Sequence, residues 1–225
     1  KDTRDLSLDA IVAALRGEPG TSVQITIAPR TGGKERDVSI VREIIEIKSV
    51  SLVEVIEEEI GYISMRQTRF SERTSEEVEQ AVRDLIAKNV KGIILDLRGN
   101  PGGLLTQATQ VADLFLPKGV PIVSIRERDG RREETKASQR RPVGGNLPLV
   151  VLIDDSSASA SEIVAGAIQD NDRGVLIGTS SFGKGSVQTI FDLHEMAGSA
   201  LKLTTALYYT PSGRSIHKDY SGQAD

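Results

Sequence analysis

Two loops of this 225-residue chain carry side chains that could together cleave an amide bond. One loop places Ser159 just before Ala-Ser-Glu162, and the other places Lys184 between two glycines. A serine at the start of a helix lies beside backbone N–H groups, which can stabilise a developing oxyanion. A lysine acts as a general base only when its amine is neutral, so burial of Lys184 would have to lower its pKa to about 7–8. The pair therefore indicates a serine nucleophile with a lysine base.

Both residues also have interpretations that involve no catalysis. Ser159 and Glu162 match a helix capping box, in which the serine hydroxyl and the glutamate carboxylate satisfy backbone N–H groups reciprocally. Lys184 could equally be a solvated lysine in a turn. Gln188 favours catalysis, because an amide can hold a neutral amine without adding charge, whereas a carboxylate there would raise the pKa of the lysine.

The segment around Lys184 also matches most of a phosphate-binding loop. Gly178 to Lys184 fits G-x-x-x-x-G-K, but Gly185 stands where a serine or threonine would bind magnesium. A phosphate loop opens a helix whose N-terminus faces the anion. Residues 186–191 instead alternate between polar and apolar side chains, which predicts a strand. Nucleotide binding is therefore the weaker alternative.

The composition excludes several other chemistries. The chain has no cysteine and only two histidines, His194 and His217, which excludes thiolate zinc sites, iron–sulfur clusters, cysteine nucleophiles and histidine-rich metal centres. Its 28 basic and 32 acidic residues give a net charge of −4, which does not favour nucleic acid as a partner. The sequence shows no targeting segment and no apolar run near the ~18 residues of a membrane span. We expect neither a metal nor another cofactor, and we assign neither histidine a catalytic role.

Strands and helices alternate along the chain from about residue 47. Apolar runs at 92–97, 149–153 and 175–177 predict buried strands, and Thr74 to Glu77 matches a capping box that would begin a helix. Strands separated by helices of this length predict βαβ units and a mixed α/β sheet. Because open α/β sheets bind ligands at the carboxyl ends of their strands, we expect the loops that follow these strands to form the site.

Residues 1–45 form a smaller unit of their own. Leu8 to Arg16 has apolar side chains at helical spacing, with Ser7 placed to cap the helix. Two alternating segments, 22–28 and 35–41, predict a pair of strands. One helix and two strands bury too little to form an independent core.

Four motifs together resemble the carboxy-terminal processing proteases, also called tail-specific proteases. Residues 95–103 read Leu-Asp-Leu-Arg-Gly-Asn-Pro-Gly-Gly, and residues 157–163 read Ser-Ala-Ser-Ala-Ser-Glu-Ile. Residues 182–188 read Phe-Gly-Lys-Gly-Ser-Val-Gln. Residues 201–214 contain Leu-Lys-Leu-Thr-Thr-Ala and, after one further residue, Tyr-Tyr-Thr-Pro-Ser-Gly-Arg. The resemblance covers about residues 55 to 214, and several motifs occur in the family's order.

The resemblance implies a serine endopeptidase that forms an acyl-enzyme and uses a Ser–Lys dyad, one of the variants of the serine–base template. The family's nucleophile falls on Ser159, its base on Lys184, and its lysine-orienting glutamine on Gln188. A distance of about 2.6–3.2 Å between Ser159 Oγ and Lys184 Nζ would indicate an assembled site. A much longer distance would indicate an inactive conformation of the same family.

The resemblance also implies an oxyanion hole made of two backbone N–H groups. One falls on Ala160, and the other falls on Gly102 or Gly103, between which the sequence does not decide. Asp96 and Arg98 are expected to shape this glycine loop rather than to react.

The resemblance extends to residues 1–45, which are similar to the second half of a PDZ-like domain, a module that captures substrate C-termini by strand addition. The family's carboxylate-binding loop has no counterpart in these residues, so we expect weak selectivity for substrate tails. Residues 46–225 then form the serine protease core. The implied partners are proteins or peptides with unstructured apolar C-termini in an extracytoplasmic setting, and a homo-oligomer or a regulatory partner also fits the family. The alternative function is that of a catalytically inactive peptide-binding fragment.

Overall fold

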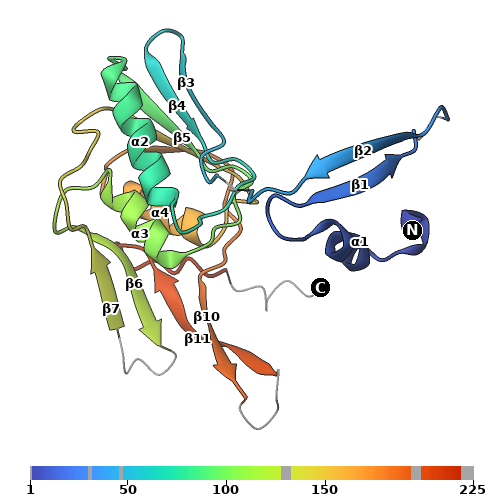
Figure 1. Cartoon of the computed structure of the whole chain (residues 1–225). Helices are drawn as coiled ribbons and strands as arrows, with labels where there is room; N and C mark the ends of the chain where they lie inside the picture. The colour runs from blue at the N-terminus through green and yellow to red at the C-terminus, as the bar shows by residue number, and fades with distance from the viewer. Residues whose placement is uncertain (1, 30–31, 46–47, 128–132, 194–198, 219–225) are drawn as a thin grey trace. The chain divides into compact units, whose positions relative to one another are not determined.

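The computed structural model describes every residue except 1, 30–31, 46–47, 128–132, 194–198 and 219–225 (Figure 1). The chain divides into two units, Lys1–Ile47 and Lys48–Asp225. His194, to which the sequence assigns no catalytic role, lies outside the described residues.

The first unit consists of two short helices and a two-stranded antiparallel sheet. Its elements are η1 (Thr3–Asp5), α1 (Leu8–Leu15), β1 (Ser22–Ile27) and β2 (Arg36–Val41). Ser7 caps α1 as predicted, because its side chain accepts a hydrogen bond from the N–H of Ala10 (3.2 Å). None of the described residues of this unit is buried, which is expected for so small a set of elements.

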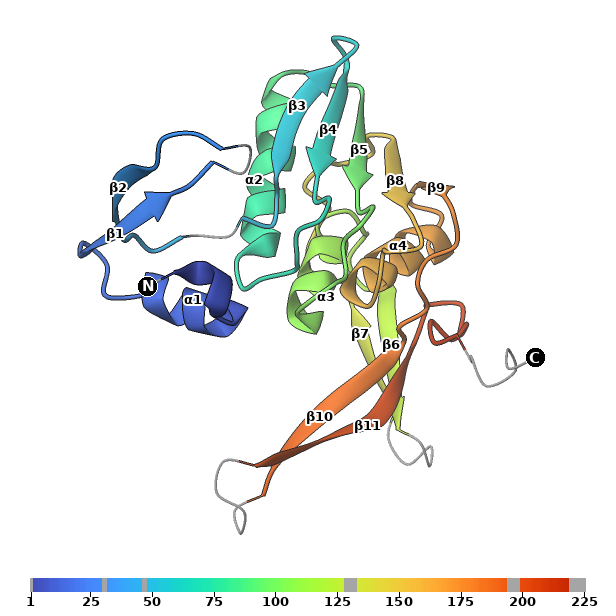
Figure 2. The ribbon, with the colours of Figure 1, turned by 90° about the vertical axis from the view of Figure 1, so that its right-hand side faces the viewer.

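The second unit is organised around a five-stranded sheet in the order β3-β4-β5-β8-β9. Its strands are β3 (Leu52–Ile56), β4 (Ile60–Ser64), β5 (Gly92–Asp96), β8 (Leu149–Ile153) and β9 (Val175–Gly178). β3 is antiparallel to β4, whereas β4, β5, β8 and β9 pair in parallel. Figure 2 shows β4, β5 and β8 ending at one edge of the sheet. The loops after β5 and β8, which carry predicted site residues, therefore lie where α/β sheets bind ligands.

Three helices and a second sheet complete this unit. The helices are α2 (Thr74–Ala87), α3 (Leu105–Asp113) and α4 (Ala160–Asp170). The second sheet is antiparallel and contains β6 (Pro121–Glu127), β7 (Glu133–Ala137), β10 (Ser186–Asp192) and β11 (Ala200–Tyr209). Its strand order is β10-β11-β6-β7. α2 packs on β3 and β4, whereas α4 contacts α3, β6 and β9. α4 therefore joins the two sheets, and the predicted mixed α/β architecture with βαβ units is confirmed.

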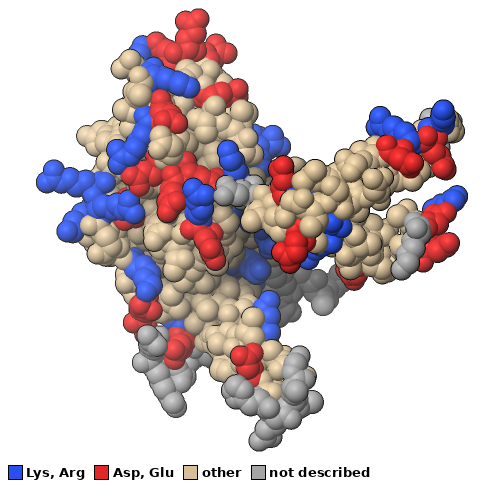
Figure 3. All heavy atoms as spheres, in the orientation of Figure 1, with Lys and Arg blue, Asp and Glu red and all other residues tan. Residues whose placement is uncertain are grey.

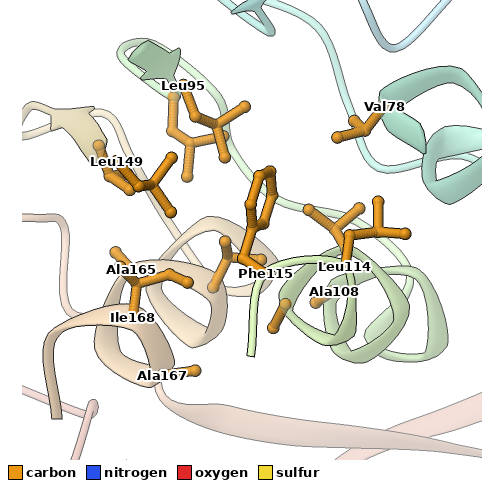
Figure 4. Packing of buried hydrophobic residues seen from close by; sticks show 14 of the residues in the cluster. Val78, Leu95, Ala108, Leu114, Phe115, Leu149, Ala165, Ala167 and Ile168 are labelled. Atoms are coloured by element: carbon orange, nitrogen blue, oxygen red, sulfur yellow. The ribbon is translucent and has the colours of Figure 1, made fainter. Parts of the chain in front are cut away.

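The core of the second unit lies between the five-stranded sheet and the helices. Leu95 of β5 and Leu149 of β8 face Phe115 and Ile168, which come from the end of the α3 segment and from α4 (Figure 4). Each of these side chains is at most 3% exposed. Burial of one such side chain contributes about 1.5–3 kcal/mol, so this packing holds α4 against the sheet and fixes the turn that precedes it.

The predicted capping box at Thr74 and Glu77 is wrong. Thr74 lies inside α2, whose N-cap position is Arg73. The carboxylate of Glu77 instead accepts hydrogen bonds from the N–H groups of Ser49 (2.9 Å) and Val50 (3.0 Å). A distant backbone segment thus competes with the local cap for the same carboxylate.

The predicted burial of the strand at 175–177 is also wrong. β9 is the edge strand of the five-stranded sheet, and Val175 and Ile177 are 60% and 53% exposed. A short apolar run predicts a strand but does not reveal whether both of its sides are covered.

Acidic and basic side chains are interspersed over the face of the second unit seen in Figure 3. Such mixing is typical of a surface without a strong field of one sign. Among the described residues, no helix has the length and apolar character needed to cross a bilayer.

Candidate active site

Ser159 lies at the end of the loop between β8 and α4. It is the N-cap residue of α4, with φ 55° and ψ −110°, a conformation that residues with a side chain rarely adopt. Such a backbone costs about 1–3 kcal/mol and is found mainly at functional sites. Ser159 ends the loop 154–159 that joins β8 to α4, so it lies beyond the carboxyl end of a parallel strand. The predicted capping box of Ser159 and Glu162 is also present, so the strained backbone occurs in addition to the cap.

Gly102 packs directly on the Ser159 turn. A β-carbon at this position would lie 2.5 Å from the carbonyl oxygen of Ala158, 2.7 Å from the nitrogen of Ala160 and 2.8 Å from the β-carbon of Ser159. Its φ of +88° is also one that glycine adopts more readily than any other residue. The glycine loop and the serine loop predicted from the sequence are therefore in contact.

The N–H groups at this contact differ in their partners. The N–H of Gly102 donates to Oδ1 of Asn100 (3.0 Å). Within the part of the chain that the structure describes, no hydrogen bond uses the N–H of Gly103 or that of Ala160. These two groups remain able to bind an oxyanion, so the geometry favours Gly103 over Gly102.

Asn100 is a buried residue that joins three segments around the site. Its side chain donates to the carbonyl of Met65 (2.8 Å) and accepts from the hydroxyl of Ser161 (2.9 Å) as well as from Gly102. Its own carbonyl accepts from the N–H of Ala158 (3.0 Å). This role is not predicted from the sequence, although an amide can donate and accept at once and suits such a junction.

Asp154, just after β8, ties the serine loop to the glycine loop. One of its oxygens accepts from the N–H groups of Gly99 (2.8 Å) and Ser156 (3.1 Å) and from the hydroxyl of Ser157 (3.1 Å). Burial raises the pKa of this carboxyl, but the hydrogen bonds from Gly99 and Ser157 outweigh it and hold the pKa below its usual value. Asp154 is therefore ionised at neutral pH. Its role is also not predicted from the sequence.

Asp96 and Arg98 shape the start of the glycine loop, as predicted. The buried carboxylate of Asp96 accepts from the guanidinium of Arg98 (2.6 and 3.0 Å) and from the hydroxyl of Tyr62 (2.7 Å). Burial raises the pKa of Asp96, but the hydrogen bonds from Arg98 and Tyr62 bring it below its usual value.

Glu162 connects the Ser159 loop to the Lys184 loop. Its Oε2 accepts from the N–H groups of Ser159 (2.7 Å) and Lys184 (2.9 Å). Its Oε1 accepts from the N–H of Gly183 (2.6 Å) and from the hydroxyl of Ser181 (2.8 Å). The hydrogen bond from Ser159 N–H is the capping interaction predicted from the sequence, whereas the contacts with residues 181–184 are not predicted.

The side chain of Lys184 is exposed, whereas the sequence predicts that it is buried. Among the residues that the structure describes, no hydrogen bond joins its amine to the hydroxyl of Ser159 or to Gln188. The amide of Gln188 donates instead to the hydroxyls of Thr204 (2.6 Å) and Ser186 (3.3 Å). The backbone of Lys184 thus lies at the Ser159 loop, but no hydrogen bond joins the two side chains among the described residues.

Gly183 and Gly185 make room for another segment of the chain rather than for the lysine side chain. A β-carbon on Gly185 would overlap the backbone of Ile216 and His217, and one on Gly183 would overlap the side chain of Lys218. The carbonyl of Gly183 also accepts from the N–H of Lys218 (3.0 Å). The space beside these two glycines is therefore filled by residues 216–218.

The phosphate-loop interpretation finds no support. β10 begins at Ser186, so the segment 178–185 does not open a helix as a phosphate loop must. Within the described ranges, no three histidine, aspartate or glutamate side chains are grouped so that they could hold a metal ion.

The sequence profile of Peptidase family S41 matches residues 59–222. The chain is 48% identical over 217 residues to a carboxy-terminal-processing protease of Bartonella bacilliformis, covering 93% of this chain and 48% of that protein. It is 40% identical over 218 residues to the carboxy-terminal processing protease CtpA of Bacillus subtilis, covering 97% of this chain and 45% of that protein. The chain thus spans about half the length of the curated relatives that it matches.

A solved structure shares this architecture. The photosystem II D1 C-terminal processing protease matches with a TM-score of 0.68 and 31% sequence identity, over 89% of this chain and 54% of that one. The likeness includes the mixed α/β arrangement with its parallel sheet and its antiparallel strands.

Proposed function

Because this chain belongs to peptidase family S41, we propose that it is a serine endopeptidase that cleaves protein substrates near their C-termini. The observation that carries this proposal is the strained turn at Ser159, which lies against the glycine loop beside two N–H groups that are available for an oxyanion. The relatives' names supply the site of cleavage, the C-terminus of a protein.

In the proposed reaction, the hydroxyl of Ser159 attacks the substrate carbonyl while the neutral amine of Lys184 takes its proton. The N–H groups of Ala160 and Gly103 bind the oxyanion of the tetrahedral intermediate. Lys184 then returns the proton to the leaving amine, and an acyl-enzyme remains on Ser159. Water, deprotonated by Lys184, attacks the ester; the bond to Ser159 breaks, Lys184 returns the proton to the Ser159 oxygen, and the new C-terminus is released.

This reaction requires the side chain of Lys184 to turn from solvent towards Ser159. The two backbone nitrogens lie within roughly 6 Å of each other, because both donate to the same oxygen of Glu162. The flexible four-carbon stem of a lysine can span such a gap. Catalytic hydrogen bonds are often long in the absence of substrate and tighten when it binds. Gln188 would then orient the amine without adding charge.

Residues 1–45 are proposed to act as a PDZ-like part that contacts substrate tails, while residues 46–225 act as the protease core. Substrates with unstructured, apolar C-termini and an extracytoplasmic setting accompany this proposal, as does assembly with further copies or a regulatory partner. The strand pair β1–β2 is the feature that supports it, since strand addition needs such a sheet.

A second candidate function is a catalytically inactive peptide-binding protein. The observation that favours it is the exposed Lys184 side chain, which makes no hydrogen bond with Ser159 among the described residues. Such a protein would bind peptides but would not form a covalent adduct at Ser159.

Cleavage of an unstructured polypeptide with an apolar C-terminus tests the two candidates. The proposed peptidase cleaves it, and Ser159→Ala and Lys184→Ala each abolish cleavage while thermal unfolding stays close to that of the unsubstituted chain. Binding without cleavage would favour the second candidate. Equal cleavage of substrates with free and amidated C-termini would fit weak tail selectivity, whereas strong discrimination would contradict it.

A further inference from the structure

We propose that Glu162 is a positioning residue whose single carboxylate holds the backbones of the nucleophile and the base together. The inference rests on the proposed function, in which Ser159 and Lys184 are that nucleophile and that base. It assigns to Glu162 a task beyond capping α4: the four groups that its carboxylate binds come from two loops that are far apart in the sequence.

The contacts of Glu162 divide evenly between its two oxygens. Oε2 receives the N–H of Ser159, at the start of α4, and the N–H of Lys184, in the loop before β10. Oε1 receives two donors from the same later loop, the N–H of Gly183 and the hydroxyl of Ser181. Movement of either loop would therefore break hydrogen bonds to a shared acceptor.

Burial makes these contacts more important than an exposed cluster of the same groups would be. Glu162 is 5% exposed, so its carboxylate and the N–H groups that face it have little water to replace a lost partner. A carboxylate can accept hydrogen bonds at both oxygens, whereas a glutamine of the same shape carries a donor at one end. The NH2 group of a glutamine at this position would face one of the two pairs of donors, so that pair would lose its acceptor.

The backbone of Lys184 is thus fixed while its side chain is free to turn. Ser157 adds a second link between the loops, because its carbonyl accepts from the N–H of Phe182 (3.0 Å). The arrangement keeps the base within reach of the nucleophile before the side chains meet. Glu162 acts through these two residues and does not itself touch the substrate.

Residue-resolved amide hydrogen exchange tests the link directly. In the unsubstituted chain, we expect the N–H groups of Ser159, Gly183 and Lys184 to be protected although they lie in loops. In Glu162→Ala, exchange should accelerate at least about tenfold in both loops, and in Glu162→Gln, which keeps one acceptor, the acceleration should be smaller. If these three N–H groups exchange as fast as unstructured amides in the unsubstituted chain, the proposal is overturned, and this result does not require any variant to fold. Acceleration in only one loop of Glu162→Ala would also overturn it.

Glu77 provides a matched control. Its carboxylate also joins a helix to two distant backbone N–H groups, those of Ser49 and Val50, but on α2. Glu77→Ala should accelerate exchange at residues 49–50 and leave the loops at Ser159 and Lys184 unchanged. The same pattern in both variants would indicate general loosening rather than positioning.

Steady-state kinetics distinguish positioning from a purely structural role, because a purely structural role would not lower kcat while KM stays unchanged. For Glu162→Ala, we expect kcat to fall about 10–100-fold and KM to stay within about threefold, because a displacement near 1 Å slows the chemical step. Glu77→Ala should keep both constants within about twofold of the unsubstituted chain. Equal kcat values for the two variants would contradict the proposal. Absence of any peptidase activity in the unsubstituted chain would count against the proposed function alone, and hydrogen exchange would still decide whether Glu162 links the loops.

Discussion

Replacing Gly102 with alanine tests how closely the glycine loop fits the serine turn. The added β-carbon would lie 2.5–2.8 Å from atoms of Ala158, Ser159 and Ala160, in a backbone with φ +88°. The left-handed conformation costs an alanine about 1–2 kcal/mol. Overlap with fixed neighbours typically adds about 1–3 kcal/mol. We therefore expect Gly102→Ala to lower the free energy of unfolding by about 2–5 kcal/mol.

Gly119 separates the two contributions. It has a similar φ of +93°, but a β-carbon there would meet nothing within 4 Å. Gly119→Ala should therefore cost only the conformational part, about 1–2 kcal/mol. Urea unfolding of the two variants measures the difference, which is the cost of the contact with the serine turn.

The same pair of variants connects this contact to catalysis. Displacement of the glycine loop would move the N–H of Gly103 away from the oxyanion, and loss of one such donor costs about 10²–10³ in kcat. We expect a fall of this size in Gly102→Ala and an unchanged kcat in Gly119→Ala. Equal destabilisation of the two variants, or a normal kcat in Gly102→Ala, would refute the reasoning.

Three further predictions concern the residues around this turn. Ser159→Gly should abolish peptidase activity but raise the free energy of unfolding by about 1 kcal/mol, because glycine adopts the observed φ and ψ with less strain. Urea unfolding measures the change, and a lower free energy of unfolding would contradict the prediction. Asp96→Asn should lower stability at pH 7 by about 1–3 kcal/mol, because asparagine has one acceptor oxygen and cannot accept from both Arg98 and Tyr62 as the carboxylate does. Burial raises the pKa of Asp96, but the hydrogen bonds from Arg98 bring the pKa below its usual value of 3.8. The stability that the Asp96 carboxylate contributes is therefore present above pH 3.8 and is lost as the pH falls through the pKa of the folded state. The free energy of unfolding should thus fall less between about pH 7 and pH 2–3 in Asp96→Asn than in the unsubstituted chain. Gly185→Ala should cost about 1–3 kcal/mol, because its β-carbon would overlap the backbone of Ile216 and His217, and unaltered urea unfolding would exclude that contact.

Much of the fold could be predicted from the sequence because its elements have strong local signals. The apolar run of β8, followed by the serine-rich loop and α4, gives a strand, a turn and a helix in that order. The glycine loop follows β5 in the same way, and parallel pairing of β5 with β8 brings the two loops to one edge. The contact between Gly102 and Ser159 follows from that topology.

Interactions between distant segments could not be predicted in this way. The capping motif at Thr74 fails because Glu77 binds backbone N–H groups 27 and 28 positions earlier. Glu162 satisfies its predicted cap and also binds the loop 19–22 positions later, which no local pattern indicates. The packing of residues 216–218 on Gly183 and Gly185 likewise joins segments that are distant in the sequence. Such partners become visible only when the whole chain is folded.

The central claim, that Ser159 is a nucleophile activated by Lys184, is tested most directly by covalent labelling. The chain would be incubated with a fluorophosphonate probe, and mass spectrometry would locate the adduct and measure its rate of formation. We predict an adduct on Ser159 in the unsubstituted chain and a rate about 10²–10⁴ lower in Lys184→Ala, the range expected for loss of a general base. Labelling of Lys184→Ala at the unsubstituted rate, or an adduct on a different serine, would contradict the claim.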